Sequence, residues 1–296
     1  MFSKSFNSKI GKIFINPTVS ERFHGGLRVK NKNLYKKKPL ITIITVVKDN
    51  PKLLEKCILS IAQQKFRNFE HIIIDGGSRE DTLNVIRKNE RHISYWISQN
   101  DKGIYDAFNR GLNYALGDVI GFVNSDDTLN KNALKILSNY LNKYPNKDFF
   151  FGSVKKHWGI LYGYKSWKIN FTWNFYSAHS CGFFIRKQSA RKIGYYNTNY
   201  RYHADYDYFY RMIKHHKLDG VGTNKNELFG IFNRGGFSSK QKFKDHIYES
   251  SVIRLNNGQS KFFVILSALA KILYNKKRLD KYVSDIFDII RYIISY

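Results

Sequence analysis

A regular alternation of strand-like and helix-like segments, beginning at residue 40, constrains the fold of this chain more than any other feature. "LITIITVV" (40–47) is a run of β-branched and apolar residues, which is typical of a strand buried on both faces. The next segment, "DNPKLLEKCILSIAQQ", has apolar residues at helical spacing, with Pro51 in the first turn and Asn50 as the expected N-cap. The two segments predict a strand and a helix joined by a short connection.

The alternation continues to about residue 145. "FEHIIIDGG", "ISYWIS" and "GDVIGFVN" predict three more strands. Three helices are predicted between and after these strands. The first begins at a capping box of Ser78 and Asp81, the second covers "GIYDAFNRGLNYAL", and the third spans 128–143. Strands and helices that alternate through short connections favour a mostly parallel sheet with helices on both faces. The sequence therefore predicts an α/β fold.

Changes in composition divide the chain into three parts. Residues 1–38 carry ten Lys or Arg and one Glu, and they predict a basic arm that is either draped over the surface or solvated. Residues 39–240 predict the main domain, in which an alternating half (39–145) precedes an aromatic-rich α+β half (146–240). Residues 241–296 predict basic, amphipathic helices, whose most apolar run is broken by Lys271 and is too short to span a bilayer.

The charge balance indicates an anionic partner. Lys and Arg number 50 against 23 Asp and Glu, which gives a net charge of +27. Such a surface concentrates nucleotides, nucleic acid or acidic lipid headgroups. Cys57 and Cys181 are too few for a disulfide framework, and the start of the chain does not have the pattern of a secretory signal, so we expect a cytoplasmic protein.

Polar side chains follow several of the predicted strands. Thr45, Asp75 and the segment 124–127 all lie at carboxyl ends of strands. In open α/β sheets the usual ligand site is the crevice beyond these ends. We therefore expect these residues to meet in one crevice.

Asp126 and Asp127 present two adjacent acids at such a strand end. Their mutual repulsion would be relieved if one acid capped the next helix, or if both faced a divalent cation, since Mg²⁺ is usually held by one or two carboxylates together with substrate phosphates. The sequence leaves both interpretations open. Asp75 is similarly either a turn residue before Gly76 and Gly77 or an acceptor for a nucleobase or ribose.

Asp205 stands at the start of the predicted helix "ADYDYFYRM". It is either an N-cap or a carboxylate whose ionised form is favoured by the helix dipole. The second arrangement suits a base that takes a proton from an attacking hydroxyl.

Three stretches together resemble successive motifs of the family 2 glycosyltransferases. They are "ITIITVVKDNPKLLEKCILSIAQQKFRNFEHIIIDGGSRED", "SQNDKGIYDAFNRGLNYALGDVIGFVNSDD" and "YHADYDYFYRM". The resemblance covers about residues 40–235 and implies the GT-A fold, a Rossmann-like, mostly parallel sheet flanked by helices. It also implies inverting transfer from a nucleotide sugar, with 39–145 as the nucleotide-sugar-binding half and 146–240 as the acceptor half.

The resemblance also implies roles for individual residues. Asp205 matches the catalytic base, and Asp126 matches the metal ligand of the family's D-x-D element, with Asp127 as the neighbouring ligand of a Mg²⁺ or Mn²⁺ cofactor. His179 lies where related enzymes carry a His on the acceptor side, and Gly235, Gly236 and Ser238 resemble a flexible segment near the active site. Nucleotide-sugar contacts are implied for Thr45, Val47, Asp75, Lys102, Arg110 and Ser125.

Two positions depart from the family pattern. Asn124 replaces the first acid of the D-x-D element, and Ala204 replaces the Glu that many members carry before the catalytic Asp. These departures leave open an inactive relative of the family.

The expected function is metal-dependent, inverting transfer from a nucleotide-diphosphate sugar, most simply a UDP-sugar, to a hydroxyl of a glycan or lipid-linked acceptor in cell-envelope polysaccharide synthesis. The basic C-terminal helices suit binding to the anionic inner face of the plasma membrane. A basic nucleic-acid-binding protein is the alternative from another class. We expect no nucleic-acid partner, because the aromatic residues lie within strand and helix patterns and the clustered acids would repel phosphates.

Overall fold

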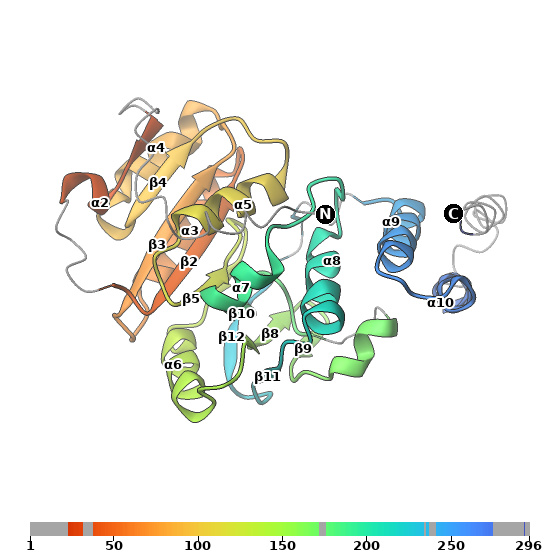
Figure 1. Cartoon of the computed structure of the whole chain (residues 1–296). Helices are drawn as coiled ribbons and strands as arrows, with labels where there is room; N and C mark the ends of the chain where they lie inside the picture. Colours follow the sequence, from red (N-terminus) through yellow and green to blue (C-terminus); the bar gives the residue numbers. More distant parts are fainter. Residues whose placement is uncertain are drawn as a thin grey trace.

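The computed structural model describes residues 23–31, 38–171, 176–233, 235–236, 241–274 and 293. Within them, an eight-stranded sheet has the order β1-β4-β3-β2-β5-β10-β7-β11 (Figure 1). Its centre is parallel and consists of β4 (Tyr95–Ser98), β3 (Phe69–Asp75), β2 (Ile41–Val47) and β5 (Val119–Phe122). The predicted α/β fold with a mostly parallel central sheet is confirmed.

Helices cover both faces of this sheet. Strand residues alternate between the faces, so that neighbouring positions of β2 contribute to different apolar clusters. Val47 packs with residues of α3 (Pro51–Ala62) and α4 (Glu80–Lys88), whereas Ile44 and Val46 pack with α5 (Ile104–Tyr114). This two-sided cover explains why the strands read as continuous apolar runs.

The aromatic-rich half extends the sheet and adds a second one. β10 (Phe183–Arg186) pairs antiparallel with β5 and β7 (Phe149–Phe151), and β11 (Gly220–Gly222) pairs parallel with β7. The second sheet has the order β6-β12-β8-β9. Its strands are β6 (Thr128–Leu129), β12 (Leu228–Ile231), β8 (Ser153–Lys156) and β9 (Gly159–Leu161).

The remaining elements join these sheets. They are the helices α6 (Ala133–Lys143), α7 (Lys187–Ile193) and α8 (Ala204–Tyr210), the short π-helix η4 (Arg211–His215), and the 3₁₀-helices η2 (Glu90–His92) and η3 (Ser166–Phe171).

Two local predictions are wrong. The helix predicted over 128–143 begins only at Ala133, because Thr128 and Leu129 pair with β12 as a short strand. The predicted capping box at Ser78 does not form, since Ser78 Oγ instead accepts a hydrogen bond from Asp49 N–H (2.8 Å) and α4 begins at Glu80. In both places a tertiary contact displaces the expected local one.

Part of the predicted basic arm belongs to the fold. β1 (His24–Gly25) pairs antiparallel with β4 and leads into the short helix α2 (Leu27–Lys30). Arg28 of α2 is fully buried and forms an ion pair with Glu70 of β3. The prediction of an arm that is draped over the surface or solvated is therefore wrong for residues 23–31, because a buried ion pair connects this stretch to the sheet.

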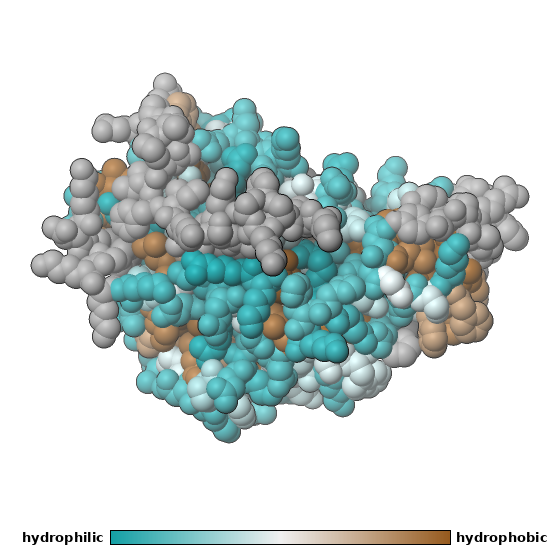
Figure 2. Space-filling view, in the orientation of Figure 1, coloured by the Kyte–Doolittle hydropathy of each residue, from teal (hydrophilic) through white to brown (hydrophobic). Residues whose placement is uncertain are grey.

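The C-terminal helices α9 (Phe243–Asn256) and α10 (Lys261–Tyr274) lie at the opposite end of the molecule from β1 and α2 (Figure 1). Ile247 of α9 packs against α10 residues such as Val264 and Ala268. Apolar surface gathers at this end (Figure 2), where four large side chains of α10 are exposed: Phe262, Phe263, Leu266 and Leu273. Over the described residues, no helix combines the length and the apolar character needed to traverse a bilayer.

Candidate active site

The carboxyl ends of the central strands are joined by backbone hydrogen bonds. Val47 and Asp75, the last residues of β2 and β3, lie opposite each other, and Gly76 N–H donates to Val47 O (2.9 Å). Ser125 N–H donates to Val46 O (3.3 Å), which brings the segment after β5 to the same edge. Val47, Asp75 and Ser125 are therefore brought together, as parallel strands require.

The Asp75 carboxylate is fully buried and rigidly held. Its Oδ2 accepts hydrogen bonds from Gly77 N–H (3.1 Å), Ser78 N–H (2.9 Å) and Ser98 Oγ (2.6 Å). Its Oδ1 is buried and has no hydrogen-bond partner among the described residues. A buried carboxylate oxygen without a hydrogen bond raises the free energy of the folded protein, and an N–H or O–H donor on a ligand would supply the missing bond.

The hydroxyl of Thr45, unlike the Asp75 carboxylate, has no atom left over for a ligand. Its side chain is fully buried within β2, with Oγ1 at 2.9 Å from His71 Nε2 and 3.8 Å from Cys57 Sγ. The hydroxyl is thus engaged inside the protein, and burial lowers the pKa of His71 to about 3. Val47 is also buried, and its backbone rather than its side chain faces the strand-end connection.

Lys102 and Arg110 occupy different environments. Lys102 is exposed, whereas Arg110 donates to the carbonyl oxygens of Gln99 (3.3 Å) and Asn100 (2.8 Å) and forms an ion pair with Asp106 (2.9 Å). Arg110 therefore stabilises the loop that follows β4.

The same loop contains an acid that the sequence analysis did not select. A Cβ added at Gly76 would lie 2.3 Å from Asp101 Oδ2, so the glycine permits this close approach. Burial raises the pKa of Asp101, against the opposing influence of Lys48 and Arg110.

The two acids after β5, Asp126 and Asp127, differ in their burial and in their pKa. Asp126 is partly buried, and burial raises its pKa. Asp127 is 1% exposed, and burial together with the charge of Asp126 raises its pKa to about 7. Asp127 Oδ1 accepts from Asn233 N–H (2.8 Å), and Asn233 Nδ2 donates to the carbonyl oxygen of Asp126 (2.6 Å). Asp127 does not cap a helix; it fastens the segment after β12 to the end of β5.

Two buried oxygen atoms of the segment 124–127 lack hydrogen-bond partners within the described part of the chain. Asn124 Oδ1 and Asp127 Oδ2 are buried without a hydrogen-bond partner among the described residues, and Asp126 lies between them in sequence. Over the same residues no group of three His, Cys, Asp or Glu side chains forms a complete metal cage. An incomplete set of hard oxygen donors fits a Mg²⁺ or Mn²⁺ ion whose remaining positions are taken by phosphate and water.

Glycines of the 235–236 segment approach these acids. A Cβ added at Gly236 would lie 2.2 Å from Asp126 Oδ2, and Gly235 has a φ of 99°, which favours glycine. Ser238 lies outside the described residues.

Asp205 lies in the first turn of α8, where His203 rather than Asp205 is the N-cap residue. Asp205 Oδ1 accepts from Tyr206 N–H (2.9 Å) and lies 3.2 Å from Tyr105 Oη, while Oδ2 accepts from Tyr176 Oη (3.3 Å). Burial raises its pKa to about 6, although these hydrogen bonds favour the charged form. A carboxylate with this pKa is well suited to accept a proton near neutral pH.

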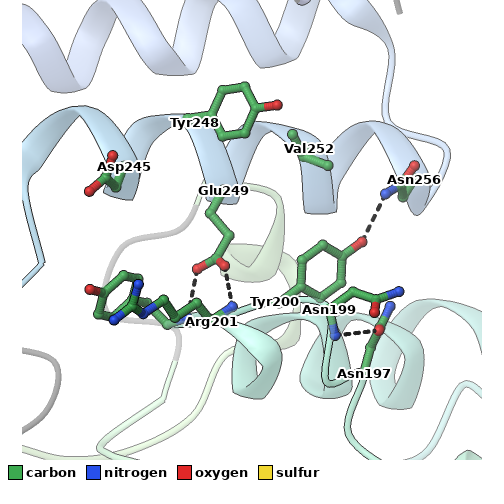
Figure 3. A pocket seen from close by; sticks show the side chains of 10 residues that line it. Asn197, Asn199, Tyr200, Arg201, Asp245, Tyr248, Glu249, Val252 and Asn256 are labelled. Atoms are coloured by element: carbon green, nitrogen blue, oxygen red, sulfur yellow. Dashed lines mark hydrogen bonds between the residues drawn. The ribbon is translucent and has the colours of Figure 1, made fainter. Parts of the chain in front are cut away.

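Helix α9 holds the loop that leads into Asp205. Glu249 accepts hydrogen bonds from the backbone N–H groups of Arg201 and Tyr202, the second at 2.9 Å (Figure 3). The carbonyl oxygen of Tyr202 accepts from Tyr105 Oη (2.7 Å), which also approaches Asp205. The loop and α9 border a pocket of about 560 Å³, which Figure 3 shows from close by.

The side chains that surround Asp205 were not predicted from the sequence. Tyr105 lies in the family-like stretch "DKGIYDAFNRG", but its aromatic ring reads as core. Tyr176 and Glu249 have no local pattern that points to Asp205, because their contacts depend on how distant segments meet.

His179 is enclosed by aromatic rings. It is 8% exposed, its Nε2 lies 2.8 Å from Tyr196 Oη, and its ring centre lies 4.8 Å from that of Phe122 and 4.9 Å from that of Phe108. Burial lowers its pKa to about 3, so the ring is neutral at pH 7. The structure places His179 in the core as a polar anchor for Tyr196.

A parallel sheet ending in Asp75 and in the segment 124–127, extended by an antiparallel aromatic half, matches the GT-A fold of glycosyltransferases. The structure of residues 1–349 of TarS from S. aureus in complex with UDP-GlcNAc superposes with a TM-score of 0.60 at 15% identity, over 86% of this chain and 80% of that TarS chain. The mannosyltransferase PcManGT from Pyrobaculum calidifontis, in complex with GDP-Man and Mn²⁺, has a TM-score of 0.56 at 12% identity, over 88% and 86%.

Sequence relatives agree with this fold. A PGL/p-HBAD biosynthesis glycosyltransferase of Mycobacterium bovis is 29% identical over 66% of this chain and 80% of its own length. A GalNAc(5)-diNAcBac-PP-undecaprenol beta-1,3-glucosyltransferase of Campylobacter jejuni is 35% identical over 36% of this chain and 35% of its own length. The model of the glycosyl transferase family 2 matches residues 42–225. The chain belongs to this family, and it is a transferase.

Proposed function

We propose that this protein is a metal-dependent, inverting glycosyltransferase that transfers a sugar from a nucleotide-diphosphate sugar, with UDP-sugars as the first candidates, to a hydroxyl of a glycan or lipid-linked acceptor. The observation that carries the proposal is Asp205, a carboxylate held by two tyrosines with a pKa of about 6. Proteins of similar fold support the donor class, because TarS binds UDP-GlcNAc and PcManGT binds GDP-Man with Mn²⁺.

Donor binding begins at the strand ends. The free Oδ1 of Asp75 is placed to accept a hydrogen bond from the nucleobase, and Oδ2 is kept in place by its own three donors. The rigidity of this carboxylate favours recognition, because little conformational freedom is lost on binding.

The diphosphate would lie against the segment after β5. Asp126, with Asp127 and Asn124 beside it, would hold a divalent ion, which supplies positive charge to the diphosphate as the nucleotide leaves. Asn233 keeps Asp127 and the backbone of Asp126 in place.

Proton removal is assigned to Asp205. The acceptor hydroxyl attacks C1 of the sugar from the face opposite the nucleotide, the bond from C1 to the phosphate oxygen breaks, and the hydroxyl proton passes to Asp205. One displacement of this kind inverts the configuration at C1 and requires no covalent intermediate.

The test combines a donor panel with one substitution. UDP- and GDP-sugars are screened with Mn²⁺ and Mg²⁺ for release of the nucleoside diphosphate, with and without a lipid-linked or oligosaccharide acceptor. Asp205→Asn should lower turnover by about 10²- to 10⁴-fold and leave donor affinity nearly unchanged. Wild-type turnover in Asp205→Asn would refute the assignment of the base.

The cell-envelope role rests on the relatives. One relative is a PGL/p-HBAD biosynthesis glycosyltransferase, and another is a glucosyltransferase for a PP-undecaprenol-linked glycan. Such acceptors lie at a membrane, and the exposed apolar side chains of α10, in a chain of net charge +27, suit a peripheral position on the anionic cytoplasmic face. Co-sedimentation with anionic but not neutral vesicles, lost in Phe262→Ser/Leu266→Ser, is the expected result; equal sedimentation of that variant would contradict it.

A further inference from the structure

Lys156, the last residue of β8, carries a charge that the proposed mechanism does not yet use. Neighbouring strand residues point to opposite faces, and Lys155 is exposed while Lys156 is half-buried. The Lys156 ammonium lies 4.4 Å from the centre of the Phe232 ring. Within the described part of the chain this ammonium makes no hydrogen bond and no ion pair.

The position of Phe232 links Lys156 to the acids after β5. Phe232 N–H donates to the carbonyl oxygen of Lys155 (2.9 Å), which fixes the ring beside the end of β8. The next residue, Asn233, holds Asp127 through its N–H (2.8 Å). Lys156 therefore extends from the strand that neighbours β12, beside the segment that fastens the two acids.

The electrostatic surroundings of Lys156 agree with this placement. Burial lowers the pKa of Lys156, while the carboxylates of Asp127 and Asp205 act in the opposite direction. The charge of Lys156 in turn favours the ionised form of Asp127. A single side chain is thus within electrostatic range of both the expected metal-binding acid and the expected base.

A half-buried ammonium without a carboxylate partner has lost hydration that the protein does not fully replace. The ring of Phe232 offsets only part of this loss through a cation–π interaction. The ammonium would gain the most from a ligand that brings an anionic oxygen to it. Between the metal site and the base, the anion that arrives with the donor is its diphosphate.

We infer that Lys156 binds the diphosphate of the donor and stabilises the leaving nucleoside diphosphate. This inference rests on the proposed function. As the bond from C1 to the phosphate oxygen breaks, the electron pair remains on that oxygen, and the Lys156 ammonium donates a hydrogen bond to the phosphate without transferring its proton. A fixed positive charge of this kind complements a metal site in which Asn124 provides an amide where the family pattern has an acid.

The experiment measures binding of UDP and of uridine, each with and without Mn²⁺, by calorimetry on the full chain. Lys156→Met should weaken UDP about tenfold or more and leave uridine unchanged, since only UDP carries the diphosphate. Lys156→Arg should retain most of the UDP affinity. Lys155→Met is the matched control, because it removes the same charge from the opposite face of β8, and it should alter UDP affinity by less than about twofold.

Three results would overturn the inference: unchanged UDP affinity in Lys156→Met, an equal loss for uridine and UDP, or an equal loss in Lys155→Met. Melting curves check that the variants are folded, and Lys156→Arg supplies the comparison if Lys156→Met does not fold. A wild-type chain that binds neither UDP nor GDP in the presence of Mn²⁺ would instead refute the proposed function itself. The two failures are therefore distinguishable.

Discussion

Arg28 and Glu70 form a fully buried ion pair that joins α2 to the central sheet. Arg28 also donates to the carbonyl oxygen of Tyr114 (2.9 Å), and Glu70 accepts from Leu116 N–H (2.7 Å). The pair thereby connects three segments that are distant in sequence. It lies partly outside the matched family region, since α2 precedes residue 42.

Loss of this pair should destabilise the fold strongly. Arg28→Met would leave the Glu70 charge buried without its cation, at a cost of about 3–5 kcal/mol in the free energy of unfolding. Lys30→Met is a matched control, because the Lys30 side chain is exposed to solvent and its bridge to Glu90 contributes only about 0–1 kcal/mol. Denaturant unfolding measures both variants, and similar losses in the two would contradict the role given to the buried pair.

Glu249 should influence catalysis from outside the catalytic residues. Because it holds the backbone of Arg201 and Tyr202, and Tyr202 contacts the tyrosine beside Asp205, Glu249→Ala should lower turnover about tenfold while donor affinity stays constant. Glu249→Gln keeps an acceptor oxygen and should recover part of the loss. Asn256→Ala removes another bond from α9, to Tyr200 Oη (2.8 Å), and should leave turnover within about twofold. A fall in melting temperature without a change in turnover would mean that Glu249 acts on stability alone.

The pH dependence of turnover should reflect Asp205. A base must be deprotonated, so activity is expected to fall as the pH decreases through about 6, the pKa to which burial raises this carboxyl. Tyr105→Phe removes a hydroxyl that favours the charged form, which raises the pKa further and shifts the acid limb to higher pH. The profile of kcat at saturating donor measures both effects; an acid limb that remains in place in Tyr105→Phe would argue against Asp205 as its source.

The sequence predicted the central strands well, because β2, β3 and β5 are long or strongly apolar and lie between clear helical patterns. It could not predict β1 and β6, since a two-residue strand has no periodicity and exists only through its partner strand. The placement of Asp75 and Ser125 at one edge followed from the parallel topology. His179 was selected by resemblance alone, whereas Thr45 was also selected by its place near a strand end, and the burial of both depends on packing that a linear motif does not contain.

For Asp205, too, the sequence predicted the position in the chain but not the surrounding contacts. Its place at the start of a helix was predictable, but the tyrosines that surround it come from α5 and from the segment before β10. Lys156 was equally invisible in sequence, because only the pairing of β8 with β12 brings it beside the acids. Residues that act through tertiary contacts can be identified only from the three-dimensional structure.

Gly236 should prove essential for the position of Asp126. A methyl group there would lie 2.2 Å from Asp126 Oδ2, so Gly236→Ala must displace the carboxylate or the loop. We expect metal affinity to fall by about tenfold or more, as for other residues that orient metal ligands. The measurement is the increase in melting temperature produced by UDP together with Mn²⁺, which should shrink in Gly236→Ala while the increase from UDP alone is preserved.

A double-mutant comparison separates this steric effect from a general disturbance of the loop. If Gly236→Ala acts through Asp126, it should cause no further loss of the metal-dependent increase in an Asp126→Ala background, because the displaced ligand is already absent. Additive losses would show that the glycine acts elsewhere, and an unchanged increase in the single variant would mean that Asp126 is not the ligand. The second result would redirect the search for the metal site to the orphaned oxygens of Asn124 and Asp127.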